Sequence, residues 1–442
     1  SPAVAHSSSD QPMRWRVMSS PPVSTPDETA EAQPLPVLEA PADGVPPLVD
    51  TVPALTSAID QLAAGTGPLA LDTERAHGFR YSPRAYLLQF RRAGAGTVLI
   101  DPIPFAAPAE RALLSSLTQR LADTPWILHA ATQDLPCLTE LDLVPTTLFD
   151  TELAARLLGR PRVALVTMIE EFFGLTLRKE HSASDWSKRP LPDGWLTYAA
   201  LDVELLVELQ ALLADELVTA QKDEWARQEF AHLVTQSTVA TTPRVDPWRR
   251  TSGLHTVRTP RGLAIVRELW QERDRLASST DRAPGRILPD RAITQLAVLG
   301  DGGEPRRILG RADLDSISEF RWRNAARYHN NWLAALDRAS SLTRDQLPPR
   351  HLAVEGPPPP RTWAARHPEA AERWERIRPG FTELAESLAV PPENLLTPDL
   401  LRRLAWEPPA DRSVEGVDAF LAGLGARPWQ RELTAAVVAP LL

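Results

Sequence analysis

Cysteine and lysine are both scarce in this sequence of 442 residues. Cys137 is the only cysteine, so the chain can form no internal disulfide and no cysteine-based metal cluster. There are three lysines, at positions 179, 188 and 222, which leaves 45 arginines among the 48 basic residues. A chain without a disulfide framework suits a reducing compartment, and we expect a cytoplasmic location.

Long apolar segments are also missing. We find no run of about 18 apolar residues, which argues against a transmembrane helix. Residues 1–10 lack the basic stretch and apolar stretch of a secretory signal, so none is expected there. No glycine-rich loop ends in Lys-Ser or Lys-Thr, which excludes the usual phosphate loop of a helicase motor. We therefore expect no membrane partner, and no obligate protein partner is evident.

Positive charge is outweighed overall, since the formal net charge is −9. The two signs are unevenly spread: Pro22–Asp50 contains six acids and no base, whereas Arg244–Arg327 contains 17 arginines and 11 acids. Nucleic-acid binding depends on where charges lie rather than on their sum. The negative total therefore does not exclude a nucleic-acid ligand.

The N-terminal half has the pattern of an α/β protein. Residues 1–45 are rich in Pro, Ser, Ala and Glu, and we predict a disordered tail. Short β-type runs at 69–74, 86–90, 98–100 and 126–129 then alternate with helical patterns at 110–121, 132–142, 151–159, 165–173 and 194–217. This order predicts one domain over residues 46–217, with a mixed sheet covered by helices.

Strand signals stop after residue 221. We predict a connecting helix and linker at 218–255, an all-α bundle at 256–342, a proline-rich linker at 343–361, and a second bundle at 362–442. Each bundle contains a similar phrase entering a helix: Leu288-Pro289-Asp290 in the first, and Leu396-Thr397-Pro398-Asp399 in the second. The bundles are therefore interpreted as repeats of one fold, although such phrases also arise by chance at helix starts.

Two carboxylates alternate at the end of the first strand, at Asp72 and Glu74. Residues two apart on a strand point to the same face, so these two anions lie side by side. They would repel each other unless a cation lies between them, and carboxylate oxygens suit Mg²⁺ or Mn²⁺. The alternative is a solvated strand end before a turn.

Further acids follow along the chain. Asp134 comes after the predicted strand 126–129, in the first turn of a helix, where the helix dipole favours a carboxylate. Tyr198 and Asp202 are four residues apart on a predicted helix, so the phenol and the carboxylate share one face. Asp134 could instead be an ordinary helix start, and Asp202 could be incidental on an amphipathic core helix.

Each of these signals is weak alone, but four acids and a tyrosine in this order form a pattern that few protein families share. With the neighbouring stretches 87–90 and 185–191, they resemble the bacterial ribonuclease D family, whose members belong to the four-acid 3′→5′ exonucleases. Segments 261–263, 269–274 and 284–290 resemble its helical C-terminal domain, which helicases share (HRDC). The resemblance implies a ribonuclease H-like mixed sheet flanked by helices, followed by two helical HRDC-type bundles. It covers residues 48–340 well and 362–442 more loosely.

The resemblance also implies a reaction. Asp72, Glu74 and Asp202 would hold one Mg²⁺ or Mn²⁺ ion, and Asp72 would bridge to a second ion supported by Asp134. Two ions about 4 Å apart can stabilise an in-line phosphodiester displacement. Tyr198 would orient the attacking water. The expected enzyme releases nucleoside 5′-monophosphates from single-stranded or 3′-tailed RNA in transfer RNA or other RNA processing; a DNA-directed exonuclease and an inactive nucleic-acid-binding module are the alternatives.

Five further residues are candidate nucleic-acid contacts. Gln89 lies in the strand after the first acids, and His129 lies at the end of the strand before Asp134. His129 could instead be a buried residue of that strand end. Arg321, Trp322 and Arg323 interleave cations with an aromatic ring, as a platform for single-stranded nucleic acid does. Trp322 could instead belong to the core of the helical bundle.

Overall fold

The computed structural model describes residues 33–302, 307–353 and 355–442. Residues 48–150 form a six-stranded sheet in the order β1-β4-β3-β2-β5-β6. The strands are β1 Leu48–Val49, β2 Thr66–Arg75, β3 Ala85–Ala93, β4 Gly96–Ile100, β5 Trp126–Leu128 and β6 Leu148–Asp150. β2, β3 and β4 pair antiparallel, whereas the pairs β1–β4, β2–β5 and β5–β6 are parallel. The predicted mixed sheet is therefore confirmed.

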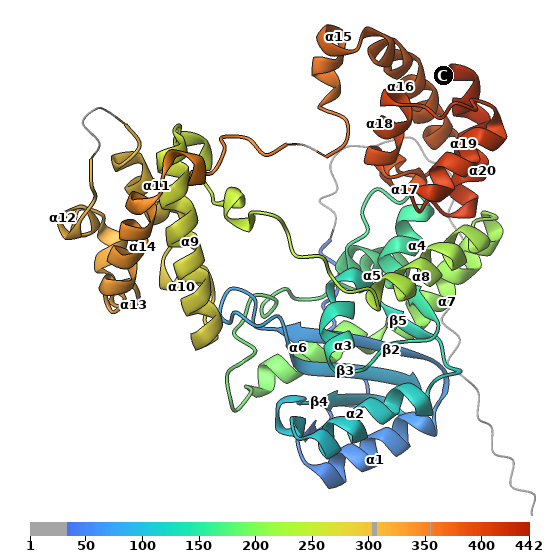
Figure 1. Ribbon diagram of the computed structural model, residues 1–442. Coiled ribbons are helices and arrows are strands. Elements are labelled where there is room, and N and C mark those ends of the chain that lie inside the picture. Colours follow the sequence, from blue (N-terminus) through green and yellow to red (C-terminus); the bar gives the residue numbers. More distant parts are fainter. Residues whose placement is uncertain (1–32, 303–306, 354) are drawn as a thin grey trace, which may run out of the picture. The chain divides into compact units, whose positions relative to one another are not determined.

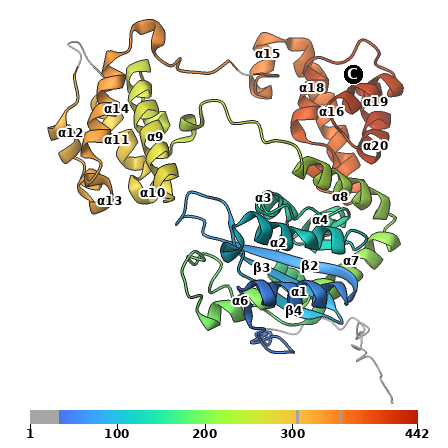
Figure 2. The ribbon, with the colours of Figure 1, turned by 60° about the horizontal axis from the view of Figure 1, so that its bottom comes forward.

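Helices cover the sheet, as Figures 1 and 2 show. They are α1 Val52–Ala63, α2 Pro108–Arg120, α3 Leu135–Glu140, α4 Thr151–Leu157, α5 Leu165–Phe173, α6 Asp193–Glu204 and α7 Leu206–Thr219. Leu55 of α1 and Leu117 of α2 share one buried cluster with Leu69 and Leu71 of β2. The intervening Ala70 belongs to another cluster, which includes leucines of α7. This alternation buries both faces of β2 and fixes its register.

The predicted single helix over 194–217 is wrong in one respect. It is divided at Leu205, whose backbone angles (φ −114°, ψ 7°) leave the helical region between α6 and α7. Buried side chains of α6, Ala199 and Ala200, pack with Leu87 of β3 and Leu99 of β4. The break gives each helix its own orientation, so α6 can bring its polar residues to the end of β2.

The predicted boundary of the disordered tail at residue 45 is also wrong. Residues 1–32 lie outside the described residues, but Val37 forms a parallel bridge with Thr176. The Leu38 amide donates to the Thr176 carbonyl at 2.9 Å, and the Ala42 amide donates to Glu204 at 3.0 Å. Backbone hydrogen bonding to the folded domain orders this proline-rich segment, an effect that composition alone does not report.

The remaining elements of the described chain are helices joined by loops and linkers. α8 Asp223–Ser237 is the predicted connecting helix. The first bundle contains α9 Pro260–Thr280, α10 Pro284–Ile287, α11 Asp290–Leu299, α12 Arg311–Asp315, α13 Arg323–Ala326 and α14 His329–Ser341. The second contains α15 Trp363–Arg366, α16 Pro368–Ser387, α17 Pro392–Leu395, α18 Pro398–Trp406, α19 Val414–Gly423 and α20 Pro428–Val438.

The two bundles share a local order of elements. In each, a helix of 20 or 21 residues precedes a four-residue helix and then a helix of nine or ten residues. Leu288 and Leu396 follow the four-residue helices in extended conformation, with φ of −153° and −155°. Both similar phrases of the sequence therefore occupy the same structural position, which supports the interpretation as repeats.

Candidate active site

Asp72, Glu74 and Asp202 come together at the end of β2. Asp72 and Glu74 lie on the same face of that strand, and α6 brings Asp202 to them. One carboxylate oxygen from each lies within 4.8 Å of the others. Three of the four predicted metal ligands are therefore close enough to bind one metal ion together.

Glu74 is held by a neighbour on the adjacent strand. Gln89 of β3 pairs with Asp72 in the sheet, and its Nε2 donates to Glu74 Oε1 at 3.1 Å. The Gln89 side chain is 0% exposed. The strand register turns this amide inward as a support for Glu74, so the structure gives Gln89 a role other than the predicted contact with nucleic acid.

Asp134 reaches the site from a loop between β5 and α3. Ala130 has a left-handed backbone (φ 59°), a short 3₁₀ turn covers Ala131–Gln133, and Asp134 precedes the first residue of α3. Thr73 Oγ1 donates to Asp134 Oδ1 at 2.6 Å. Thr73 lies between the two acids of β2 in the sequence, so one short segment orders all three carboxylates.

A buried carboxylate that the sequence does not reveal as part of the site organises this loop. Asp150, the last residue of β6, accepts hydrogen bonds from the amides of Ala130 (3.1 Å) and Ala131 (2.9 Å). It also accepts from Glu152 and Leu153 at the start of α4, at 2.9 and 3.1 Å. An Asp before a helix start is a capping signal, but its contact with the Ala130 loop is not visible in the sequence.

Tyr198 lies one turn before Asp202 on α6, as predicted. Its ring is 5.7 Å from the ring of His181 and 6.3 Å from that of Trp186. Burial raises the pKa of Tyr198, and the charges of Asp202, Glu74 and Asp72 add to the shift. The phenol is therefore protonated at neutral pH and available as a hydrogen-bond donor.

The carboxylates repel one another in a site that is largely shielded from water. Burial raises the pKa of Asp72 and Glu74 well above the usual range, and neighbouring acids contribute to both shifts. Burial also raises the pKa of Asp202 to about 7 and that of Asp134 to about 6. A group of four acids with raised pKa values, in which Asp134 also raises the pKa of the other three, fits divalent metal ions, because Mg²⁺ and Mn²⁺ prefer such oxygen ligands.

A cavity of about 420 Å³ opens beside Glu74. Basic side chains also line it, from Arg75, His77 and Arg80. A smaller cavity of about 190 Å³ includes Tyr198 and Asp202. Acids together with arginines suit a phosphodiester, because the acids can hold metal ions while the arginines bind phosphate oxygens.

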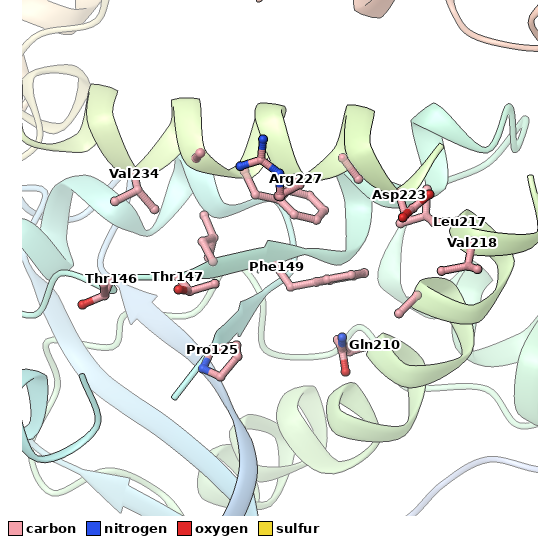
Figure 3. A pocket seen from close by; sticks show the side chains of 15 residues that line it. Pro125, Thr146, Thr147, Phe149, Gln210, Leu217, Val218, Asp223, Arg227 and Val234 are labelled. Atoms are coloured by element: carbon pink, nitrogen blue, oxygen red, sulfur yellow. The ribbon is translucent and has the colours of Figure 1, made fainter. Parts of the chain in front are cut away.

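A larger cavity lies elsewhere and is lined mostly by apolar groups. It has a volume of about 500 Å³, and Phe149 of β6 lies between Arg227 of α8 and Gln210 of α7 (Figure 3). None of the predicted catalytic residues lines it. Size alone therefore does not identify the reactive site.

His129 is placed for a structural role. Its Nδ1 lies 2.8 Å from Thr151 Oγ1 at the start of α4, and its Nε2 is buried. This position agrees with the alternative of a strand-end residue, and the contact of His129 with nucleic acid stays a prediction. Burial lowers the pKa of His129 to about 4, although Glu152 opposes the shift.

This depressed pKa predicts how acid weakens the fold. In the unfolded chain His129 takes up a proton near pH 6.5, whereas in the folded chain it stays neutral until about pH 4. Stability present at neutral pH is therefore lost as the pH falls through this range, by about 2 kcal/mol between pH 7 and 5. Urea unfolding at both pH values should show a smaller loss for His129→Gln. The exposed His255→Gln should keep the wild-type loss, and an unchanged loss in His129→Gln would contradict a cost of protonating His129 in the folded state.

Arg321, Trp322 and Arg323 are all exposed at the start of α13. Trp322 is 54% exposed, so the alternative that it belongs to the bundle core is wrong. The core of this bundle is formed instead by other side chains, including the fully buried Trp332 and Phe320. An exposed indole between two arginines is free to stack on a base.

Comparisons with known proteins agree with this geometry. The family description "3'-5' exonuclease" matches residues 47–218, "HRDC domain" matches residues 262–336, and "3' to 5' exonuclease C-terminal domain" matches residues 356–442. The chain is 30% identical to ribonuclease D of a Jannaschia species over 67% of this chain and 77% of that protein. It is also 30% identical to ribonuclease D of Escherichia coli over 68% of this chain and 76% of that protein.

Solved structures are similar over nearly the whole length. A crystal structure of a protein from Bifidobacterium adolescentis is 37% identical with a TM-score of 0.81, covering 92% of this chain and 99% of that one. The structure of Escherichia coli RNase D, described as an exoribonuclease involved in structured RNA processing, is 25% identical with a TM-score of 0.62. That match covers 90% of this chain and 98% of the other. Among the residues that the structure describes, no helix is both long and apolar enough to cross a membrane.

Proposed function

The chain belongs to the ribonuclease D family of 3′→5′ exoribonucleases, and from this premise we propose that it hydrolyses RNA with two divalent metal ions held by its buried acids. The observation that carries the proposal is the approach of Asp72, Glu74 and Asp202 to within 4.8 Å. The positive charge of Arg75 lowers the pKa of Glu74, but this pKa still lies well above its usual value, so Arg75 offsets the negative charge of the acids only in part. A carboxylate set of this kind gains stability when it binds Mg²⁺ or Mn²⁺.

Each acid has a distinct place in the proposed site. Asp72, Glu74 and Asp202 would hold one ion, and Asp72 with Asp134 would hold the second. Bound metal ions supply Lewis-acid stabilisation of the attacking and leaving oxygens. The chain's own contribution is rigidity: Gln89 fixes Glu74 and Thr73 fixes Asp134, so the ligands are ordered before substrate binds.

Tyr198 would orient the water that attacks the scissile phosphate. Its raised pKa makes it a poor base at neutral pH, so we assign it a hydrogen-bonding role. Arg75 and Arg80 line the adjacent cavity and would bind the phosphate oxygens of the terminal nucleotide. The product would be a nucleoside 5′-monophosphate, released from the 3′ end.

The proposed substrate is RNA with a single-stranded 3′ end, such as a transfer RNA precursor. Structured RNA processing is the role given for Escherichia coli RNase D. The match covers 98% of that structure and 90% of the present chain. Arg321, Trp322 and Arg323 are exposed. The Trp322 ring would stack on a base, and the two arginines would contact backbone phosphates, before the RNA strand enters the active site.

One assay tests the proposed function directly. Purified protein is incubated with 3′-tailed RNA and a matched DNA, each with Mg²⁺, Mn²⁺ or EDTA, and mononucleotides are separated and counted. We expect release from RNA with metal and none with EDTA. Release from DNA alone would overturn the ribonuclease assignment, and no release under any condition would favour an inactive binding module.

Tyr198→Phe removes the hydroxyl and leaves the ring packed against Trp186 and His181. We expect kcat to fall about 10- to 100-fold, because a misplaced nucleophile loses much of the benefit of alignment. The KM for RNA and the binding of metal should be unchanged, since the phenol is not a proposed metal ligand. Steady-state kinetics with saturating Mn²⁺ measures both. A wild-type kcat would remove Tyr198 from the mechanism.

Trp322→Ala should weaken binding of single-stranded RNA about tenfold, because stacking of one base contributes about 1–3 kcal/mol. Fluorescence anisotropy with a labelled RNA and metal-free protein measures the affinity without cleavage. Trp322→Phe keeps an aromatic face and should retain most of the affinity. Equal affinity of Trp322→Ala and wild type would remove this residue from the substrate path.

A further inference from the structure

A short loop after β2 forms one wall of the cavity beside the catalytic acids. This rim loop, His77–Ser82, lines the cavity of about 420 Å³ together with Thr73 and Glu74. It starts only three residues after Glu74. Its first turn is set by the Ala76 carbonyl, which accepts from the amides of Phe79 and Arg80, both at 3.0 Å. A shift of this loop would change the shape of the cavity that receives the scissile phosphate.

The first helical bundle holds the middle of the rim loop. Arg286 of α10 donates from Nε to the Gly78 carbonyl at 2.6 Å, and its guanidinium lies 4.0 Å from the centre of the Phe79 ring. The Ala283 amide, just before α10, donates to the Phe79 carbonyl at 3.1 Å. Two consecutive backbone carbonyls and one ring are therefore fixed by a single turn of the bundle.

The same bundle also holds the end of the rim loop. Tyr81 donates from its hydroxyl to Asp274 of α9 at 3.1 Å. The Ser82 amide donates to Asp281 Oδ1 at 2.9 Å. Asp281 ends α9 with a left-handed backbone (φ 49°), and this conformation belongs to the turn that leads into α10. Four residues of the loop thus contact the helical bundle.

The remaining side of the rim loop contacts the exonuclease domain itself. Arg80 donates from Nε to Ser187 Oγ at 2.9 Å. Ser187 directly follows Trp186, whose ring centre lies 6.3 Å from that of Tyr198. The rim loop therefore connects the helical bundle to the support of a catalytic residue.

We propose that the first helical bundle positions the rim loop, and through it promotes the chemical step, in addition to any RNA that the bundle binds. The inference rests on the proposed function for its catalytic consequence, but not for the contacts themselves. Arg286 and Asp281 are positioning residues in this proposal, since neither lines the cavity beside Glu74. The expected effect appears even with a substrate too short to reach the bundle.

Two pairs of variants separate positioning from general stability. Arg286→Ala removes the donor and the cation over Phe79, whereas Arg286→Lys retains both kinds of contact. Asp281→Gly removes the acceptor and suits the left-handed backbone, whereas Asp281→Asn retains a carbonyl oxygen. Arg311→Ala is the matched control, because this exposed arginine of α12 pairs with Asp315 of its own helix.

The first measurement is hydrogen–deuterium exchange of the segment 77–82 in the full-length protein without metal or RNA. We expect exchange to rise about tenfold in Arg286→Ala and Asp281→Gly, because local opening becomes easier. The Lys and Asn variants and Arg311→Ala should resemble wild type. Unchanged exchange in both disruptive variants would overturn the proposal, whatever the activity of the enzyme.

The second measurement is kinetics on a dinucleotide and on a long single-stranded RNA, with saturating Mn²⁺. In the two disruptive variants kcat should fall about tenfold on both substrates, because a misplaced wall weakens alignment of the phosphate. If wild type does not cleave the dinucleotide, the proposal is tested by kcat at a saturating concentration of the long RNA. A rise in KM with wild-type kcat would overturn the proposal in favour of simple RNA binding. Inactivity of wild type itself would refute the proposed function, and the exchange data would still test the contacts.

Discussion

Asp72→Asn and Asp202→Asn are each expected to lower the rate of RNA hydrolysis by about 10⁴-fold or more, since removal of a charged ligand disrupts two-metal catalysis. Both side chains lie in the group within 4.8 Å that would hold a metal ion. An amide has nearly the same shape as a carboxylate but supplies no negative charge, so the fold should be retained. Initial rates with Mn²⁺ and 3′-tailed RNA measure the loss.

Asp193→Asn is the matched control for these variants. Asp193 lies on α6, like Asp202, but is exposed in the first turn of the helix. Its activity should equal that of wild type. Substantial turnover by either Asp72→Asn or Asp202→Asn would remove that residue from the metal site.

The Asp202→Asn replacement should also stabilise the metal-free protein. Burial among like charges makes Asp202 unfavourable in its charged form, so this variant should melt a few degrees higher while lacking activity. Thermal denaturation in EDTA at pH 8 measures this difference. A variant that is both inactive and less stable than wild type would indicate that Asp202 is needed for packing rather than for metal binding.

Metal removal should have the second large effect. EDTA is expected to abolish hydrolysis, and restoring Mn²⁺ or Mg²⁺ should restore it. Binding should also stabilise the wild-type protein, by about 2.7 kcal/mol for one site at a hundredfold excess over its dissociation constant. Thermal denaturation with and without Mn²⁺ detects this as an upward shift of the transition of the exonuclease domain.

Variants distinguish specific metal binding from general effects of salt. Asp72→Asn should lose most of the shift, because Asp72 is proposed to contact both ions, whereas Asp193→Asn should keep it. Ca²⁺ is a useful comparison, since it takes oxygen ligands in a less regular geometry. An equal shift in wild type and Asp72→Asn would contradict metal binding at this site.

Much of the exonuclease domain was predictable because its signals are local. The apolar run at 165–173 coincides with α5, and the alternation around Asp72 and Glu74 placed both on one strand face. The spacing of Tyr198 and Asp202 also placed them on one helix. Such periodicities survive in the fold because burial of one face follows directly from them.

What could not be predicted depends on contacts between distant segments. β1 and β6 have two and three residues, too few for a recognisable pattern, and exist because other strands pair with them. The inward position of Gln89 is not predictable, because nothing local reveals the strand register that turns it toward Glu74. The exposure of Trp322 likewise depends on which aromatic residues fill the bundle core, a choice made by packing.

Asp150 has a practical consequence for anyone who maps this enzyme by mutation. Four amides already occupy its carboxylate, two of them from the loop that carries Asp134. A screen scored by turnover would rank Asp150→Ala beside variants of the proposed metal ligands, because relaxation of that loop would displace Asp134. An equilibrium titration with Mn²⁺ would distinguish Asp150, which orders the loop, from the acids that are proposed to bind the metal ions.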